Sequence, residues 1–171
     1  MNIQNKTVLI TGANRGIGRA LVIEALSRGA TRVYAGTRRA LTVADARVTA
    51  LTLDVTNAWQ IEQAATEVNT LDVLINNAGI ALNDDLSNFD VIEQHLAVNL
   101  FGSLKMSRVF LPKLKRSHGA IVNTLSLMAL APLPLTPAYA ISKAAAFNMT
   151  QSLRALLAGQ RDSPWRVPRS H

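Results

Sequence analysis

The sequence predicts a doubly wound α/β fold, in which helices cover both faces of a parallel sheet. Short apolar runs alternate along the chain with longer amphipathic stretches, which is the order of strand–helix–strand units. The runs are continuously apolar, as expected for strands that are buried on both faces. About five strands can be recognised, without a repeat or a linker between them. Ligands of such folds bind at the carboxyl ends of the strands, so functional motifs should gather there.

The first half of the chain reads as four strands and two helices. The run KTVLIT at residues 6–11 predicts a buried strand, and residues 16–28 predict the helix after it. The runs TRVYAGT at residues 31–37 and RVTALTL at residues 47–53 predict the second and third strands. A helix is then expected near residues 57–68, and a fourth strand at residues 71–75.

The second half begins with a long helical stretch, expected from about Ser87 to Lys115. The sequence SNFD at its start resembles a capping box. A fifth strand is predicted at residues 120–125, and a last helix at residues 138–157. Thr136 is the expected N-cap of that helix, with Pro137 at its first position.

Composition indicates one globular domain with a real core, since 49% of the 171 residues are hydrophobic and 17% are charged. The absence of cysteine excludes a disulfide scaffold and thiol catalysis. Residues 1–7 lack the apolar core of a signal peptide. The most apolar stretch, residues 124–141, is interrupted by Pro132, Pro134 and Pro137, so no membrane span is expected. We therefore expect a cytoplasmic protein.

The net charge of +7 raises the question of nucleic-acid binding. The basic residues are scattered, and only 5% of the chain is aromatic. The one tight cluster, residues 113–116, lies at a predicted helix end, where cations complement the helix dipole. We therefore favour a phosphate-bearing small ligand over nucleic acid.

A glycine-rich loop, TGANRGIG, follows the first predicted strand at residues 11–18. Its glycines are Gly12, Gly16 and Gly18, in the spacing G-x-x-x-G-x-G. Glycines allow a backbone to turn sharply and approach a pyrophosphate, which then rests on a helix N-terminus. An ordinary strand-to-helix turn is the alternative, although three glycines in seven residues exceed what such a turn requires.

The end of the second strand bears on the choice of cofactor. NAD sites usually carry an acid about 20 residues beyond the glycine loop, which binds the ribose 2′-hydroxyl. This chain instead has Arg38 and Arg39 there, and its next acid is Asp45. Two guanidinium groups can pair with a 2′-phosphate, with help from Arg15 in the loop. NADP is therefore favoured over NAD, and solvated surface arginines are the alternative.

Tyr139 and Lys143 lie four residues apart in the last predicted helix, which makes them neighbours on one face. A nearby positive charge favours the ionised form of an acid. The pair is therefore suited to giving and accepting protons.

Taken together, these motifs resemble the short-chain dehydrogenase/reductase family, whose signatures are T-G-x-x-x-G-x-G, N-N-A-G and Y-x-x-x-K. Residues 76–79 supply NNAG, and the resemblance runs from residue 6 to about residue 158. Asp54 and Val55 stand where the family contacts adenine. Asn99 and Ser126 stand where the family has its catalytic asparagine and serine.

The resemblance implies a Rossmann-type sheet and an oxidoreductase that transfers hydride between NADP(H) and a carbonyl or secondary alcohol. Tyr139 would exchange a proton with the substrate oxygen, and Lys143 would assist it and hold the nicotinamide ribose. Ser126 would bind the substrate oxygen, while Asn99 would hold a water that links Lys143 to solvent. No metal is implied. The residues implied to bind the cofactor are Gly12, Asn14, Arg15, Gly16, Ile17, Gly18, Arg38, Arg39, Asp54, Val55, Asn77, Ala78, Gly79, Tyr139 and Lys143.

The final residues, GQRDSPWRVPRSH at 159–171, depart from the family pattern. The family continues with a sixth strand, a substrate lid and a seventh strand, and prolines such as Pro164 and Pro168 suit no central strand. We therefore expect an incomplete domain at residues 1–158 and a non-homologous tail, with a frameshift shortly after Gln160 as the hypothesis for its origin. The alternative to an active enzyme is thus a catalytically inactive NADP-binding fragment. Homo-oligomers are typical of the family.

Overall fold

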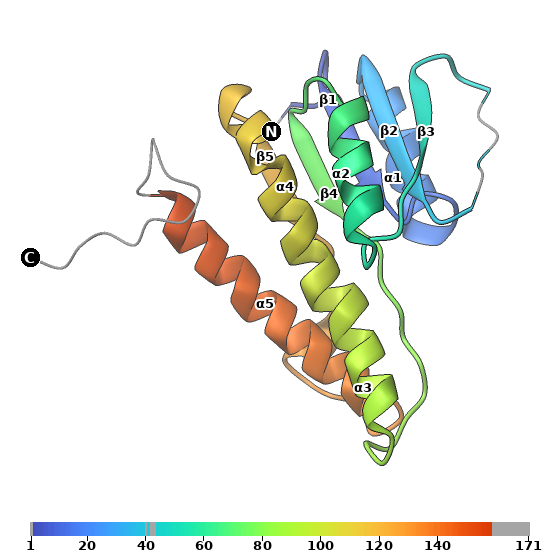
Figure 1. The fold of residues 1–171 in the computed structure, drawn as a ribbon, viewed down its shortest axis with the longest axis vertical. Helices are drawn as coiled ribbons and strands as arrows, with labels where there is room; N and C mark the ends of the chain where they lie inside the picture. Colours follow the sequence, from blue (N-terminus) through green and yellow to red (C-terminus); the bar gives the residue numbers. More distant parts are fainter. Residues whose placement is uncertain (1, 40, 42–43, 159–171) are drawn as a thin grey trace, which may run out of the picture. The chain divides into compact units, whose positions relative to one another are not determined.

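The computed structural model describes residues 2–39, 41 and 44–158 (Figure 1). They fall into two compact units. The first combines the chain up to Gly79 with Phe101–Thr124, and the second combines Ile80–Leu100 with the residues from Leu125 onward. The predicted non-homologous tail, residues 159–171, lies outside the described residues.

The first unit is built on a five-stranded parallel sheet with the strand order β3-β2-β1-β4-β5. This arrangement confirms the predicted doubly wound α/β fold. The strand boundaries differ from the predicted ones by no more than about two residues, the usual scatter of such boundaries. The strands are β1 (Thr7–Thr11), β2 (Arg32–Thr37), β3 (Val48–Thr52), β4 (Val73–Asn76) and β5 (Ala120–Asn123).

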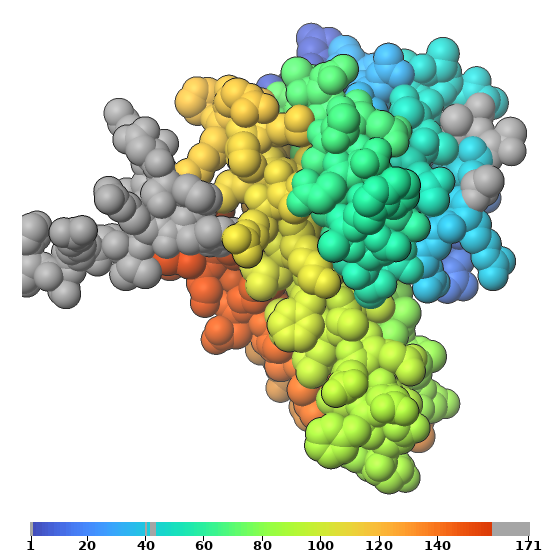
Figure 2. Space-filling view, viewed as in Figure 1, coloured from blue at the N-terminus to red at the C-terminus, as the bar shows by residue number. Residues whose placement is uncertain are grey.

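Three helices cover this sheet. The helix α1 (Gly16–Ser27) lies on one face, and α2 (Ala58–Glu67) and α4 (Ser103–Arg116) lie side by side on the other (Figures 1 and 2). Successive side chains of β1 point to opposite faces, so each face receives its own core. Val8 and Ile10 pack in the α1 core, while Leu9 points toward the other face; all three are fully buried.

The second unit is helical. It contains α3 (Phe89–His95), the 3-10 helix η2 (Leu127–Ala129) and α5 (Pro137–Ala158), and both α3 and η2 pack against α5. The π-helix η1 (Leu96–Gly102) continues α3 and leads into α4. The long helical stretch predicted from about Ser87 to Lys115 consists of three helical segments in succession, α3, η1 and α4.

The predicted capping box at Ser87 is wrong by one residue. The N-cap of α3 is Asn88, whose side chain accepts a hydrogen bond from the Asp90 amide at 2.9 Å. The Ser87 hydroxyl instead donates to Asp85. Serine and asparagine both favour turns and caps, so which of two neighbours caps a helix depends on where the preceding turn closes.

The helix α5 begins at Pro137, as predicted, and Thr136 immediately precedes it. The Thr136 hydroxyl, however, donates to the Met128 sulfur at 3.6 Å. The Ala138 amide in the first turn donates to both carboxylate oxygens of Asp84, each at 3.2 Å. A distant acid thus serves this helix N-terminus. Among the described helices, none has both the length and the apolar character that a membrane span requires.

Candidate active site

The glycine loop joins β1 to α1 at the carboxyl edge of the sheet in the first unit. A Cβ atom on Gly18 would lie 2.1 Å from the Gly12 carbonyl oxygen, and one on Gly12 would lie 2.9 Å from Ala78 Cα. Gly12 and Gly16 also have positive φ angles of 68° and 52°. A Cβ at Gly16 would meet no atom within 4 Å. Gly12 and Gly18 thus permit close packing, and Gly16 leaves open space beside the loop.

Residues of the NNAG motif hold this loop in place. The Thr11 hydroxyl oxygen accepts hydrogen bonds from the amides of Asn77 and Ala78, at 3.0 and 2.9 Å. The Asn77 side chain donates to the Thr11 carbonyl oxygen at 3.0 Å. These bonds join the end of β1 to the end of β4, so Asn77 fixes the start of the glycine loop against the residues that follow β4.

The start of α1 has no negative charge of its own. Its first turn contains no acid, and its N-cap residue, Arg15, makes no side-chain capping hydrogen bond. Asn14, Arg15 and Ile17 are exposed. Amides at a helix N-terminus carry partial positive charge and attract anions. The loop and the helix start are therefore suited to a diphosphate.

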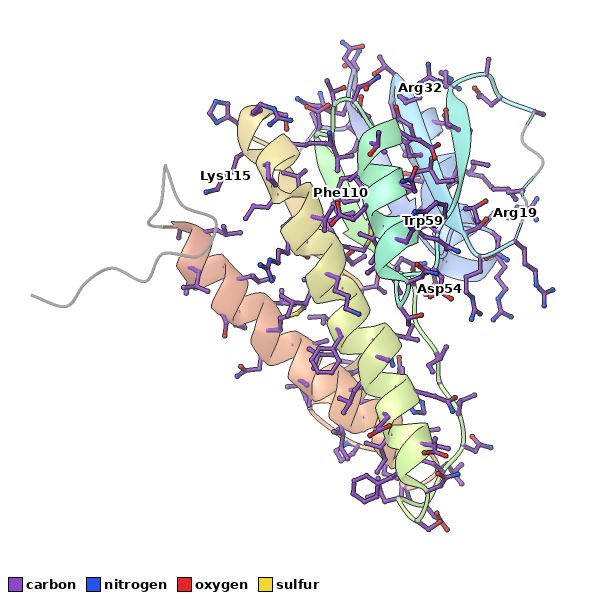
Figure 3. All side chains as sticks on the ribbon, in the orientation of Figure 1. Arg19, Arg32, Asp54, Trp59, Phe110 and Lys115 are labelled. Atoms are coloured by element: carbon purple, nitrogen blue, oxygen red, sulfur yellow. The ribbon has the colours of Figure 1, made fainter. Side chains whose placement is uncertain are left out.

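Arg38 and Arg39 follow β2 at the same carboxyl edge, and both are exposed. The Arg39 carbonyl oxygen accepts a hydrogen bond from the Thr37 hydroxyl, which ties this turn to the end of the strand. Figure 3 shows the two edges of the sheet: Arg32 marks the amino edge of β2, and Asp54 marks the carboxyl edge beyond β3.

Asp45, the nearest acid after the arginines, precedes β3 and so belongs to the amino edge of the sheet. Arg47 donates to its two carboxylate oxygens at 3.1 and 2.7 Å. These hydrogen bonds, first from the Arg47 side chain and then from its amide, lower the pKa of Asp45 to about 2. Asp45 therefore binds Arg47 at the amino edge of the sheet, opposite the edge where the glycine loop lies.

Asp54 and Val55 follow β3 at the carboxyl edge. One carboxylate oxygen of Asp54 accepts from the amide and the hydroxyl of Thr56, at 2.8 and 2.7 Å. Val55 is buried, and Asn57 rather than Asp54 is the N-cap of α2. The local turn thus holds the Asp54 side chain without making it a helix cap.

In the second unit, Asn99 lies within the π-helix η1, a type of distortion that is frequent at functional sites. Its side chain accepts from the Ile80 amide and donates to the Ile80 carbonyl oxygen, both at 2.9 Å. It also donates to the Ser142 hydroxyl oxygen at 2.8 Å. Asn99 is 2% exposed, so these bonds satisfy an otherwise buried amide.

Tyr139 and Lys143 lie together on α5, as their spacing predicts. The Lys143 Nζ atom is 5.7 Å from the centroid of the Tyr139 ring. Lys143 is only 6% exposed, and this burial lowers its pKa from the ordinary value of 10.5. The Ser142 hydroxyl donates to the Tyr139 carbonyl oxygen at 2.7 Å, which connects Asn99 to the same helical turn.

Ser126 belongs to the same unit and immediately precedes η2. Its hydroxyl oxygen accepts from the Met128 amide at 3.2 Å, which makes it the N-cap of this short helix. An accepting hydroxyl keeps its own hydrogen for a second partner. Capping therefore does not use the hydroxyl hydrogen of Ser126.

Two of the residues in these networks, Thr11 and Ser142, were not among the predicted site residues. Thr11 is the first letter of the glycine motif, so the motif itself contained a signal for it. Ser142 adjoins Lys143, but nothing in the sequence indicates that it meets Asn99, 43 residues away.

Comparison with known proteins agrees with this arrangement. The profile of the short chain dehydrogenase family matches residues 6–161. The ketoacyl reductase HetN of Nostoc sp. is 35% identical over 92% of this chain. Rat estradiol 17-beta-dehydrogenase 2 is 33% identical over 91% of it. The chain spans 60% of the length of the first relative and 45% of the second.

Solved structures show the same fold. A short chain dehydrogenase from Burkholderia cenocepacia in complex with NADP has a TM-score of 0.87 and 40% identity, covering 94% of this chain and 70% of its own. A short chain dehydrogenase from Leptospira borgpetersenii with bound NAD+ has a TM-score of 0.83 and 27% identity, covering 91% of this chain and 66% of its own. With the family profile matched along nearly the whole chain, and the glycine loop and the tyrosine–lysine pair both in place, this chain belongs to the short chain dehydrogenase family.

Proposed function

We propose that this chain transfers hydride between NADP(H) and a carbonyl or secondary alcohol. The observation that carries the proposal is the Tyr139–Lys143 pair, in which a buried ammonium group lies 5.7 Å from the centroid of a phenol ring. Such a pair is suited to general acid–base chemistry at a substrate oxygen. The names of two relatives, a ketoacyl reductase and an estradiol dehydrogenase, describe reactions of this kind.

The nicotinamide cofactor, when bound, supplies or accepts the hydride. Tyr139 would donate its phenolic proton to the carbonyl oxygen during reduction and take it back during oxidation. The positive charge of Lys143 would favour the phenolate that this exchange requires. Ser126, with its hydroxyl hydrogen still available, would donate to the same substrate oxygen as negative charge develops on it.

Asn99 would act through its neighbours. Its bond to Ser142 holds the helical turn that carries Lys143, and its two bonds to Ile80 hold the chain segment that follows the NNAG motif. We propose that the water linking Lys143 to solvent is held beside this network.

We propose NADP rather than NAD as the cofactor. Arg38 and Arg39 follow β2 at the carboxyl edge, where an NAD site usually carries an acid. Asp45 is held by Arg47 at the opposite edge and so would not supply that acid. The similar structure at 40% identity contains NADP, and the one at 27% identity contains NAD+.

A second candidate is a catalytically inactive NADP-binding fragment of such an enzyme. The chain spans 60% and 45% of the lengths of the two curated relatives. In this proposal residues 1–158 form an incomplete dinucleotide-binding domain, and residues 159–171 form a tail outside it. Cofactor contacts would survive, whereas substrate turnover would not.

Calorimetric titration with NADPH and NADH tests the cofactor proposal. We expect NADPH to bind at least about tenfold more tightly, since a charge-assisted hydrogen bond contributes about 1.5–3 kcal/mol. Joint replacement of Arg38 and Arg39 by alanine should weaken NADPH binding and leave NADH binding nearly unchanged. Tighter binding of NADH by the unmodified chain would refute the preference.

Turnover separates the two candidates. An active enzyme should oxidise NADPH with at least one member of a panel of ketones and aldehydes, and Tyr139→Phe should abolish this activity. Folded protein that binds NADPH but turns over no member of the panel would instead support the inactive fragment. Failure to bind either nucleotide would contradict both.

A further inference from the structure

His95, the last residue of α3, is a fully buried imidazole whose two ring nitrogens are both hydrogen-bonded within the second unit. Nδ1 lies 2.7 Å from the Val91 carbonyl oxygen, and Nε2 accepts from the Leu82 amide at 3.0 Å. A carbonyl oxygen can only accept, and an amide N–H can only donate. The partners therefore assign a neutral ring with its hydrogen on Nδ1.

The Leu82 amide belongs to the segment Ile80–Leu86, which has no regular secondary structure and is tied down at three points. Asn99 holds Ile80 through two hydrogen bonds, and His95 holds Leu82. Asp84 completes the set, because its carboxylate accepts from the Ala138 amide and its own amide donates to the Leu135 carbonyl oxygen at 3.2 Å. His95 is the middle of these three tethers.

The same imidazole meets the ring of Tyr139. The two ring centroids are 6.3 Å apart, and the ring planes make an angle of 64°. This edge-to-face arrangement is a favourable geometry for aromatic pairs. Both nitrogens of His95 are hydrogen-bonded to backbone groups, which restrains the orientation of the imidazole. The imidazole therefore packs in a defined position beside the phenol ring of Tyr139.

We propose that His95 is a positioning residue for Tyr139: its neutral ring joins Leu82 to α3 and thereby holds the phenol in the orientation needed for proton transfer. The inference rests on the proposed function, since it concerns the same tyrosine. Proton transfer requires a closely held donor, and a misplacement of about 1 Å can cost about a hundredfold in rate.

Two variants separate the hydrogen bonds from the bulk of the ring. His95→Phe keeps an aromatic ring of similar size but can neither accept from Leu82 nor donate to Val91. His95→Gln loses the ring but can still offer a carbonyl oxygen to the Leu82 amide. NADPH affinity serves as the control, because His95 is not among the residues proposed to bind the cofactor.

In a turnover assay, we expect His95→Phe to lower kcat for carbonyl reduction by about ten- to a hundredfold while NADPH affinity changes by less than about twofold. We expect His95→Gln, which keeps an acceptor for the Leu82 amide but lacks the ring beside Tyr139, to recover part of the lost rate. A rate in His95→Phe equal to that of the unmodified protein, or a loss in His95→Gln as large as in His95→Phe, would overturn the proposal.

A second measurement requires neither turnover nor a variant at His95. The chain has only two tyrosines, so Tyr34→Phe leaves Tyr139 as the single tyrosine in an NMR spectrum. With isotope-labelled histidine and tyrosine, we expect His95 nitrogen shifts typical of the Nδ1–H form and a cross-peak between the His95 and Tyr139 rings. An Nε2–H form of His95, or no contact between the His95 and Tyr139 rings, would contradict the inference even if the protein were an active enzyme. Conversely, the expected spectrum without turnover would contradict the proposed function alone.

Discussion

Lys143 illustrates how burial sets the properties of single residues in this protein. The side chain is 6% exposed, so its ammonium group has lost most of its hydration. Desolvation disfavours the charged form and lowers the pKa of Lys143 below 10.5. A lysine that gives up its proton more readily is better suited to relaying protons. Keeping this buried side chain charged, however, lowers the free energy of unfolding.

The destabilisation caused by charged, buried Lys143 decreases as the pH rises. The unfolded chain binds the Lys143 proton more tightly than the folded chain, so charged Lys143 lowers the free energy of unfolding near neutral pH. The penalty fades as the pH rises through the lowered pKa toward 10.5. We expect any stability advantage of Lys143→Met over the unmodified protein to decrease between pH 7 and pH 10.

Urea unfolding at the two pH values measures the effect. Lys143→Arg is the matched control, because an arginine stays charged throughout this range and should show no such change with pH. An advantage of Lys143→Met that is the same at both pH values would contradict the assigned role of burial.

At the scale of elements, the starts of α2, α3 and α5 are completed by side chains from outside the helix. Asn57 accepts from the Gln60 amide at 3.1 Å at the start of α2, and Asn88 serves α3 in the same way. For α5 the acceptor is Asp84, which comes from a segment 54 residues earlier in the chain. A carboxylate at a helix N-terminus also interacts favourably with the helix dipole.

Removal of this contact should loosen the start of α5, where Tyr139 lies. We expect Asp84→Ala to lower the free energy of unfolding by about 1 kcal/mol, the usual value for a lost N-cap. Asp84→Asn keeps an acceptor without the charge and should lose less. Urea unfolding gives the stability, and faster hydrogen exchange at the Ala138 amide would locate the change. Unaltered exchange there in Asp84→Ala would count against this contact.

At the scale of the whole molecule, β5 is a strand edge of the first unit. Among the described strands it pairs only with β4, and Val122 in its middle is 40% exposed. Val122 stands in register with Ile75, which packs against the α1 core. An exposed apolar strand edge promotes association with other chains.

We expect Val122→Lys to reduce association of the purified chain, because a charge on an edge strand opposes pairing with a second edge. Val122→Ile, which stays apolar and β-branched, should associate as the unmodified chain does. Sedimentation velocity over a wide concentration range distinguishes the two. Equal association of all three proteins would show that this edge is not responsible.

Much of the fold was predictable because it depends on local patterns. Continuous apolar runs indicated all five strands, since a strand buried on both faces needs apolar residues throughout. The caps were less predictable. Ser87 and Asn88 have similar local preferences, and only the structure distinguishes them. The π-helix at Asn99 was also missed, since apolar periodicity does not distinguish it from an α-helix.

The candidate site, too, could be predicted from the sequence only in part. The order of the elements, the glycine loop and the pairing of Tyr139 with Lys143 could be recognised in the sequence, because each depends on residues within a few positions of one another. Three other sets of contacts could be identified only from the folded chain. Asn99 bonds to Ile80 and Ser142, Asp84 accepts from the start of α5, and His95 accepts from Leu82 beside Tyr139. The physical reason is separation along the chain: these partners are 13 to 54 residues apart, and packing alone brings them within hydrogen-bonding distance.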